Sequence, residues 1–186
     1  MSKISAAIVV FALAIAGYFA IAHIKERTSY SGGATQEVDL IKEMEKNGIP
    51  KIEANHLDGK PFENDKIKDK LVIVSFWASW CDPCVKEWPS MIKLVEHFKG
   101  KLVLVAVSHD YTLEDINSFL NVVKARNKPN IEILWDKEGV NAKKFGSSKL
   151  PENYIVGRDG KLIRKIIGVE QWYSPDAVEY FEGFIR

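Results

Sequence analysis

The chain has 186 residues, of which 46% are hydrophobic, and its formal net charge at pH 7 is +1. This length and composition allow one ordinary domain with a well-buried core. A charge so close to zero, without an arginine-rich tract, gives no electrostatic basis for binding nucleic acid. Only two cysteines occur, so no further pair is left for a structural disulfide.

The N-terminal segment is an uncharged, largely apolar run over residues 4–24. It is long enough to cross the hydrocarbon of a membrane, which takes about 20 residues. We expect residues 1–27 to be an uncleaved, single-pass membrane anchor, because the apolar core of a cleaved signal peptide is usually shorter. A signal sequence is the alternative, since Ala14-Ile15-Ala16 and Ala20-Ile21-Ala22 resemble cleavage sites, and it would yield a secreted soluble form. Both interpretations place the remaining chain outside the cytoplasm.

Residues 28–48 are predicted to be a tether followed by a short helix. The sequence TSYSGGA at the start of this segment is typical of flexible linkers. Apolar side chains at helical spacing favour a helix over residues 36–47. The globular domain is expected to cover residues 49–186, with an edge strand near its start at Ile52–Leu57.

The strongest pattern in the chain joins a strand to a helix across the two cysteines. The continuous apolar run Leu71–Trp77 predicts a central strand that is buried on both faces. Cys81-Asp82-Pro83-Cys84 follows it closely, and apolar residues then recur at helical spacing from Trp88 to Phe98. The two cysteines therefore lie where a buried strand passes into the first turn of a helix.

This placement has a chemical consequence for the cysteines. The first turn of a helix has free backbone N–H groups and the positive end of the helix dipole, which favour a thiolate over a thiol. Because Cys81 comes first, we predict that it is the attacking thiolate and that Cys84 forms a reversible disulfide with it. A zinc site is disfavoured because it would need two more ligands. A structural disulfide is disfavoured because so small a loop would stabilise the fold little.

The rest of the chain predicts alternating strands and helices. Leu102–Val107 is a second apolar strand, and its helical connection to the first strand implies a parallel pair with a right-handed crossover. The later elements are a helix from a capping box at Thr112 to about Arg126, a strand at Ile131–Trp135, a short helix capped by Asp136 and ending at Phe145, a hairpin of Leu150–Val156 and Lys161–Ile167, and a helix that begins at Ser174.

The segment FWASWCDPCVKEWP at residues 76–89 resembles the active site of thioredoxin-fold proteins. More narrowly, it is similar to the membrane-anchored thiol–disulfide oxidoreductases of the TlpA/ResA/CcmG kind, and the resemblance extends over residues 49–186. It implies an α/β thioredoxin-like fold, with a central mixed sheet flanked by helices and an N-terminal extension. TlpA-like domains also carry an inserted helix and strand, which the stretch Thr112–Trp135 fits.

The resemblance also implies roles for residues near the cysteines. In thioredoxin-like folds the proline that matches Pro151 is cis and faces the cysteine pair, which would let the backbone of Leu150 pair with a substrate chain. ResA-like proteins carry an active-site glutamate at the position of Glu87, and its spacing from Cys84 suits a proton acceptor for that thiol. A solvent-facing glutamate is the alternative. Thioredoxins themselves keep a buried aspartate where this chain has Ser75, which gives Glu87 more weight.

Three residues beside the cysteines are predicted to contact substrate or to tune the pair. Trp80 is predicted to shield Cys81 and to offer a flat apolar surface to a peptide, with core packing as the alternative. The Asp82 carboxylate opposes a thiolate at Cys81 and so favours a reductant over a strong oxidant, with helix capping as the alternative. Pro83, between the cysteines, is predicted to tune the pair.

Together these features predict an enzyme that needs no cofactor or metal and reduces protein disulfides outside the cytoplasm. The resemblance implies apocytochrome c as a substrate and a membrane thiol protein as the electron donor. One alternative is an oxidant or isomerase, which the potential of the pair would distinguish. Another is a copper chaperone, for which His109 is the one candidate ligand, although it is otherwise expected at the surface. A peroxidase is disfavoured because Ala78 replaces the Thr or Ser that such enzymes carry three residues before the cysteine.

Overall fold

The computed structural model describes residues 13–22 and 36–185. Residues 13–22 are helical, and Ile41–Arg186 form one compact unit. None of the helices in the described ranges combines the length and apolarity that a membrane crossing requires. Most of the predicted anchor and the whole predicted linker at residues 28–34 lie outside the described residues.

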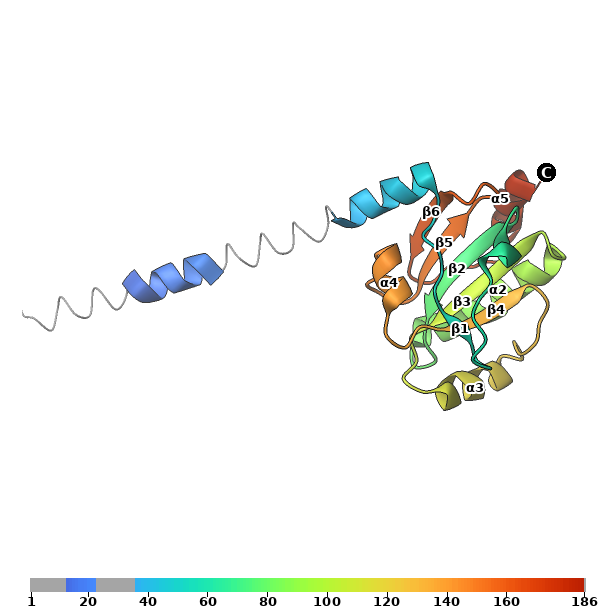
Figure 1. Ribbon diagram of the computed structural model, residues 1–186, viewed down its shortest axis with the longest axis horizontal. Coiled ribbons are helices and arrows are strands. Elements are labelled where there is room, and N and C mark those ends of the chain that lie inside the picture. The colour runs from blue at the N-terminus through green and yellow to red at the C-terminus, as the bar shows by residue number, and fades with distance from the viewer. Residues whose placement is uncertain (1–12, 23–35, 186) are drawn as a thin grey trace, which may run out of the picture. The chain divides into compact units, whose positions relative to one another are not determined.

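A six-stranded mixed sheet forms the centre of the compact unit, with the strand order β1-β4-β3-β2-β5-β6 (Figure 1). Strands β2, β3 and β4 run parallel to one another, while β1, β5 and β6 are each antiparallel to their neighbours. The predicted central mixed sheet is therefore confirmed. The strands are β1 Asn55–His56, β2 Leu71–Trp77, β3 Leu102–Ser108, β4 Ile131–Trp135, β5 Glu152–Val156 and β6 Leu162–Ile167.

Four labelled α-helices pack against this sheet, and residues 36–47 form a further helix before it. The labelled helices are α2 Asp82–His97, α3 Leu113–Val122, α4 Val140–Phe145 and α5 Pro175–Ile185, and a 3₁₀ helix covers Asn64–Ile67. Helix α3 is shorter than the sequence predicts. It ends at Val122, and Lys124 then adopts a φ of 53°, in the left-handed region that an α-helix cannot continue through.

Strand β2 is buried along its whole length, and its side chains alternate between two cores. Ile73 and Trp77 point to the face covered by α2, α3 and α5. Val74 and Phe76 point to the opposite face, which α4 covers. The continuous apolar run of β2 follows from this arrangement, because neither face of the strand meets water.

The predicted edge strand Ile52–Leu57 is mostly wrong, because only Asn55–His56 pairs with the sheet. Two asparagine side chains form hydrogen bonds with the backbone of Ile52 and Glu53, where the predicted strand would have paired with a neighbouring strand. The amide of Asn64 accepts from the N–H of Ile52 and donates to its carbonyl, both at 2.9 Å. The amide of Asn141 binds Glu53 in the same way, at 2.8 and 2.9 Å.

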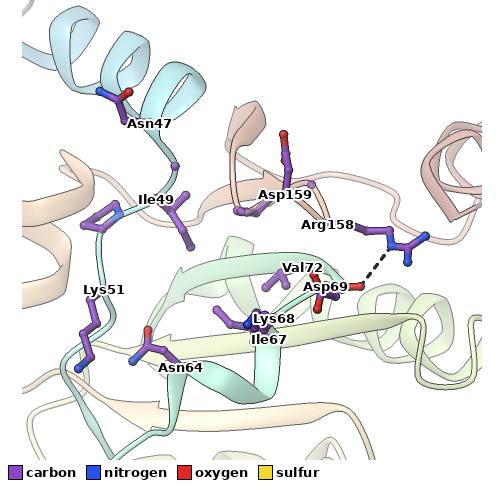
Figure 2. Close-up of a pocket in the computed structure, with 15 residues that line it drawn as sticks. Asn47, Ile49, Lys51, Asn64, Ile67, Lys68, Asp69, Val72, Arg158 and Asp159 are labelled. Carbon is purple, nitrogen blue, oxygen red and sulfur yellow. Dashed lines mark hydrogen bonds between the residues drawn. The ribbon is translucent and has the colours of Figure 1, made fainter.

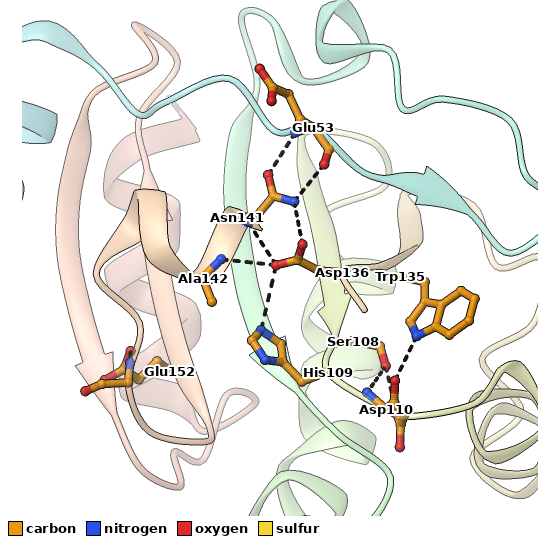
Figure 3. A network of polar contacts seen from close by, with 10 residues as sticks. Glu53, Ser108, His109, Asp110, Trp135, Asp136, Asn141, Ala142 and Glu152 are labelled. Atoms are coloured by element: carbon orange, nitrogen blue, oxygen red, sulfur yellow. Dashed lines mark hydrogen bonds and ion pairs between the residues drawn. The ribbon is translucent and has the colours of Figure 1, made fainter. Parts of the chain in front are cut away.

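The prediction that Asp136 caps the short helix is confirmed, although from outside the N-cap position. Gly139 is the N-cap residue and offers no side chain. The carboxylate of Asp136 instead accepts from the backbone N–H groups of Asn141 and Ala142, at 2.9 and 3.1 Å (Figure 3). Because Asn141 also holds Glu53, this network fastens the chain before β1 to α4.

We expect Asn141→Ala to destabilise the fold by about 2–4 kcal/mol, because it leaves several buried polar groups without their partner. Urea unfolding followed by circular dichroism measures the free energy of unfolding. Asn121→Ala, at an exposed position of α3, is the control and should change that free energy by less than about 0.5 kcal/mol. Equal costs for the two variants would contradict the assigned role of Asn141.

Candidate active site

The two cysteines lie at the start of α2, directly after the turn that follows β2. Cys81 is the N-cap residue and Cys84 lies in the first turn, and their sulfurs form a disulfide with the Cα atoms 5.3 Å apart. The backbone N–H of Cys84 donates to the sulfur of Cys81 at 3.3 Å. One sulfur is therefore held against a free N–H group at the positive end of the helix dipole.

The two cysteines differ in how far they can be reached. Cys81 is 6% exposed, whereas Cys84 is fully buried in the core between α2 and the sheet. A molecule that approaches the surface therefore meets the sulfur of Cys81 and is screened from that of Cys84.

Pro151 lies at the same edge of the sheet as the cysteines. In the antiparallel register of β2 and β5, Phe76 faces Glu152, so the residues just before β5 lie beside the end of β2. The peptide bond between Leu150 and Pro151 is cis, as the resemblance implies. Pro151 is buried and its carbonyl accepts from the N–H of Gly168 at 2.9 Å. The fold therefore brings this proline to the end of the sheet from which the cysteines extend.

Trp80 is on the surface, so the alternative of core packing is wrong for this residue. Its side chain is 54% exposed, and its ring stacks on that of Tyr111 with the centroids 6.2 Å apart. Asp82 and Pro83 are exposed in the first turn of α2, where the N-cap position belongs to Cys81. All three residues are thus available to a partner that reaches Cys81.

Glu87 is 2% exposed, so the alternative of a solvent-facing glutamate is wrong. It lies three residues after Cys84, on the same face of α2. Its carboxylate accepts from the indole N–H of Trp172 at 3.1 Å and from the amide of Asn153 at 3.2 Å. Burial raises the pKa of the Glu87 carboxyl above its usual value, and these two hydrogen bonds oppose the rise.

The buried carboxylate of Glu87 comes from helix α2, and the strand beneath it carries Ser75 and no acidic residue. Ser75 faces Asn153 across β2 and β5, and directly paired residues project to the same face of a sheet. The side-chain amide of Asn153 donates to the Glu87 carboxylate on that face. The carboxylate therefore lies against two neutral side chains, Ser75 of β2 and Asn153 of β5. The buried acid of this site is thus provided by α2 and not by β2.

Sequence reasoning missed four residues of the site. Asn153 and Trp172 lie 66 and 85 positions from Glu87 along the chain, so no periodicity connects them. Asp110 is 1% exposed, and its carboxylate accepts from the backbone N–H of Ser79 at 3.0 Å. Tyr111, the next residue, stacks on Trp80.

His109, predicted at the surface, is partly exposed, with 22% of its side chain accessible, and it packs edge-on against Phe76 with the ring centroids 5.7 Å apart. Its Nε2 atom lies 4.0 Å from the carboxylate of Asp136 (Figure 3). Burial lowers the pKa of His109 below its usual value, and the charge of Asp136 opposes this effect. Among the described residues there is no group of three or more His, Cys, Asp or Glu side chains that could hold a metal ion.

A cavity of about 440 Å³ lies at the other end of β2 (Figure 2). Its lining includes Val72 near the start of β2 and Val156 at the end of β5, and Arg158 donates to the carbonyl of Asp69 there at 3.2 Å. Its charged residues are of both signs: Lys51, Lys68, Asp69, Arg158 and Asp159. Because the cysteines follow the opposite end of β2, disulfide chemistry takes place away from this cavity.

Comparison with known proteins agrees with this geometry. The model of the AhpC/TSA family matches residues 46–165. The chain belongs to the AhpC/TSA family. The thiol-disulfide oxidoreductase ResA of Bacillus thuringiensis subsp. konkukian is 32% identical over 144 residues, which cover 76% of this chain and 78% of that protein. ResA of Bacillus subtilis is 27% identical over 125 residues, which cover 67% and 68%.

A solved structure leads to the same conclusion. The putative thiol:disulfide interchange protein DsbE from Chlorobium tepidum has a TM-score of 0.62 and 25% identity, and the match covers 74% of this chain and 92% of that one. The predicted resemblance and the thioredoxin-like fold are therefore confirmed. The protein is a thiol–disulfide oxidoreductase, and Cys81 and Cys84 are its redox-active pair.

The raised pKa of Glu87 makes the stability of the fold depend on pH. The native state favours the protonated carboxyl, so its contribution is fully present below the unfolded-state pKa of about 4.5 and is lost as the pH rises through the folded-state pKa. We expect the stability of the native protein relative to Glu87→Gln to fall as the pH rises from 4 to 8. Urea unfolding at each pH measures it, with Glu96→Gln, exposed on the same helix, as the control. A difference that stays constant over this range would contradict the assignment.

Proposed function

We propose that this oxidoreductase reduces protein disulfides, with Cys81 as the attacking thiolate and Cys84 as the resolving thiol. The observation that carries the proposal is the asymmetry of the pair at the start of α2. Cys81 is the N-cap and keeps 6% of its surface exposed, whereas Cys84 is fully buried. A helix start lowers the pKa of a thiol, and exposure gives access to a partner, so both properties needed in a nucleophile fall on Cys81.

The exchange proceeds in two balanced steps. The Cys81 thiolate attacks one sulfur of the substrate disulfide, forms a mixed disulfide and releases the other substrate sulfur as a thiolate. Cys84, once deprotonated, attacks the sulfur of Cys81 and releases the second substrate thiolate. The substrate gains two electrons and the Cys81–Cys84 pair is left oxidised, the form in which the structure holds it. A membrane thiol protein then returns two electrons to the pair.

Glu87 is the proposed proton acceptor for Cys84. The two residues share a face of α2, and the carboxylate is held in place by Trp172 and Asn153. Burial raises the pKa of Glu87 toward that of a thiol, and a base works best when its pKa lies near the working pH. The hydrogen bonds from Trp172 and Asn153 favour the charged form of the carboxyl and so oppose this rise in its pKa.

The direction of the reaction is proposed to be reduction. Asp82 is exposed in the first turn of α2, next to Cys81, and a neighbouring carboxylate disfavours a thiolate. A strong oxidant needs a stabilised thiolate in its reduced form, which Asp82 opposes. The midpoint potential of the pair distinguishes the reductant from an oxidant or isomerase, because a strongly negative value is expected only for the reductant.

The proposed substrate surface includes Leu150, Pro151, Trp80, Asp82 and Pro83. Leu150 and Pro151 precede β5 at the edge from which the cysteines extend, and an extended chain can pair with backbone there as an added strand. The other three residues are exposed around Cys81. Together they form the contact region for a polypeptide whose disulfide reaches Cys81.

The proposed location is outside the cytoplasm, with residues 1–27 as anchor, residues 28–48 as tether and residues 49–186 as the redox domain. Apocytochrome c, whose thiols must be free for haem attachment, is the proposed substrate.

The structure of the domain suits a tethered enzyme. Ile49 donates to the carbonyl of Gly160 at 2.9 Å, in the turn after β5, so the chain joins the domain at the end of the sheet opposite the cysteines.

We expect Cys84→Ala to trap substrates as mixed disulfides with Cys81, because no resolving thiol remains. Non-reducing electrophoresis of cells that express the variant, followed by mass spectrometry, identifies the trapped proteins. Cys81→Ala and the double variant are the controls and should trap nothing. Adducts that form equally well in Cys81→Ala would show that Cys81 is not the nucleophile.

We expect Glu87→Gln to slow the attack of Cys84 on the mixed disulfide by at least about tenfold near pH 7, since a positioned base contributes about 10²–10⁴-fold. Stopped-flow measurement of the resolution rate from pH 5 to 9 tests this, with Glu96→Gln as the control. The proton role of Glu87 is refuted if the rate and its pH dependence are the same in the variant and the native protein.

A further inference from the structure

Glu152 and Lys165 form a buried ion pair directly after Pro151. Glu152 is 1% exposed, and the side chain of Lys165, on β6, is 9% exposed. Tyr154 faces Lys165 across β5 and β6, so Glu152 and Lys165 are diagonal neighbours on one face of the sheet, with Oε1 and Nζ 3.4 Å apart. Removing two charges from water is costly, and apolar side chains of similar volume often stabilise a fold equally well. This pair therefore calls for a role besides stability.

The ion pair holds the short segment that leads from α4 to Pro151. The carboxylate of Glu152 accepts from the backbone N–H of Ser148 at 3.1 Å. The ammonium group of Lys165 donates to the carbonyl of Gly146 at 3.3 Å. The backbone N–H groups of residues 146 and 147 bond back to α4, so the two charged side chains are what connect this segment to the sheet.

We propose that Glu152 and Lys165 are positioning residues, which hold Leu150 in the backbone conformation that pairs with a substrate polypeptide. Strand addition needs backbone groups that are already aligned, and a segment that is fixed before its partner arrives loses less entropy on binding. Charges with defined hydrogen-bond partners specify one arrangement of the segment, whereas apolar contacts tolerate several. The pair thus acts on polypeptide disulfides and not on small disulfides, which have no backbone to align. The proposal rests on the proposed function and adds the residues that shape its substrate surface.

The test compares a peptide disulfide with a small one in the full-length, reduced protein in detergent micelles. The probes are a disulfide-linked peptide pair and bis(2-hydroxyethyl) disulfide, and stopped-flow fluorescence gives the second-order rate constant for each. The double variant Glu152→Met, Lys165→Met removes both charges and retains apolar volume. We expect its ratio of peptide to small-disulfide rate constants to fall about tenfold, as the loss of two backbone hydrogen bonds to the substrate would cause. Its urea midpoint should equal or exceed the native value.

Glu152→Gln removes only the charge of the carboxylate and should lower the ratio about threefold, because a hydrogen bond weakens when its acceptor becomes neutral. This variant decides the test if the double variant does not fold. The matched control is Glu96→Met, Lys128→Met, which removes a more exposed ion pair and should leave the ratio unchanged. A folded variant that keeps the native ratio, or that reduces both probes more slowly by the same factor, overturns the proposal and leaves the proposed function standing. A native protein that reduces neither probe overturns both.

Discussion

The site depends on one contact, in which the first turn of α2 presents a backbone N–H to the sulfur of Cys81 at 3.3 Å. This contact is rigid because the elements on either side of it are fixed by packing. β2 is buried on both faces and ends four residues before Cys81, and α2 buries Trp88 and Leu94 against the same sheet. The core of the domain therefore sets the position of the sulfur at the positive end of the helix dipole, where a thiolate is favoured.

A second ionisable group, the carboxyl of Glu87, lies inside that core. The carboxylate of Glu87 is almost fully buried, and an unpaired carboxylate in an apolar interior would simply stay protonated. Trp172 and Asn153 each give it a hydrogen bond, one from the loop before α5 and the other from β5. Desolvation and hydrogen bonding thus act on its pKa in opposite directions, with desolvation the larger effect. The balance is set by parts of the chain that are remote in sequence from the cysteines.

Local sequence patterns predicted most of the fold and the centre of the site. They could not predict contacts between segments that lie far apart in the sequence. Three features can each be recognised within one turn or one strand: the apolar run of β2, the cysteines after it and the N-cap at Thr112. The hydroxyl of Thr112 accepts from the N–H of Asp115 at 3.2 Å. The donors to Glu87 cannot be recognised in this way, because those hydrogen bonds join segments with no shared periodicity. The edge strand was mispredicted for the same reason. The composition around Ile52 favours a strand, but the side-chain amide of Asn64 takes the backbone hydrogen bonds of Ile52 that a neighbouring strand would otherwise make.

Parallel topology explains why so much of the chemistry gathers at one edge. β2, β3 and β4 point the same way, so their carboxyl ends, and the starts of the helices that follow, share one edge of the sheet. Cys81 comes from the first of these ends and Tyr111 from the second, while β5 runs antiparallel and brings Pro151 to the same edge. The helix starts there carry partial positive charge, which favours an anion at this edge over any other part of the sheet. The fold thus places the sulfur of Cys81, the exposed aromatic rings and the proline at one edge of the sheet.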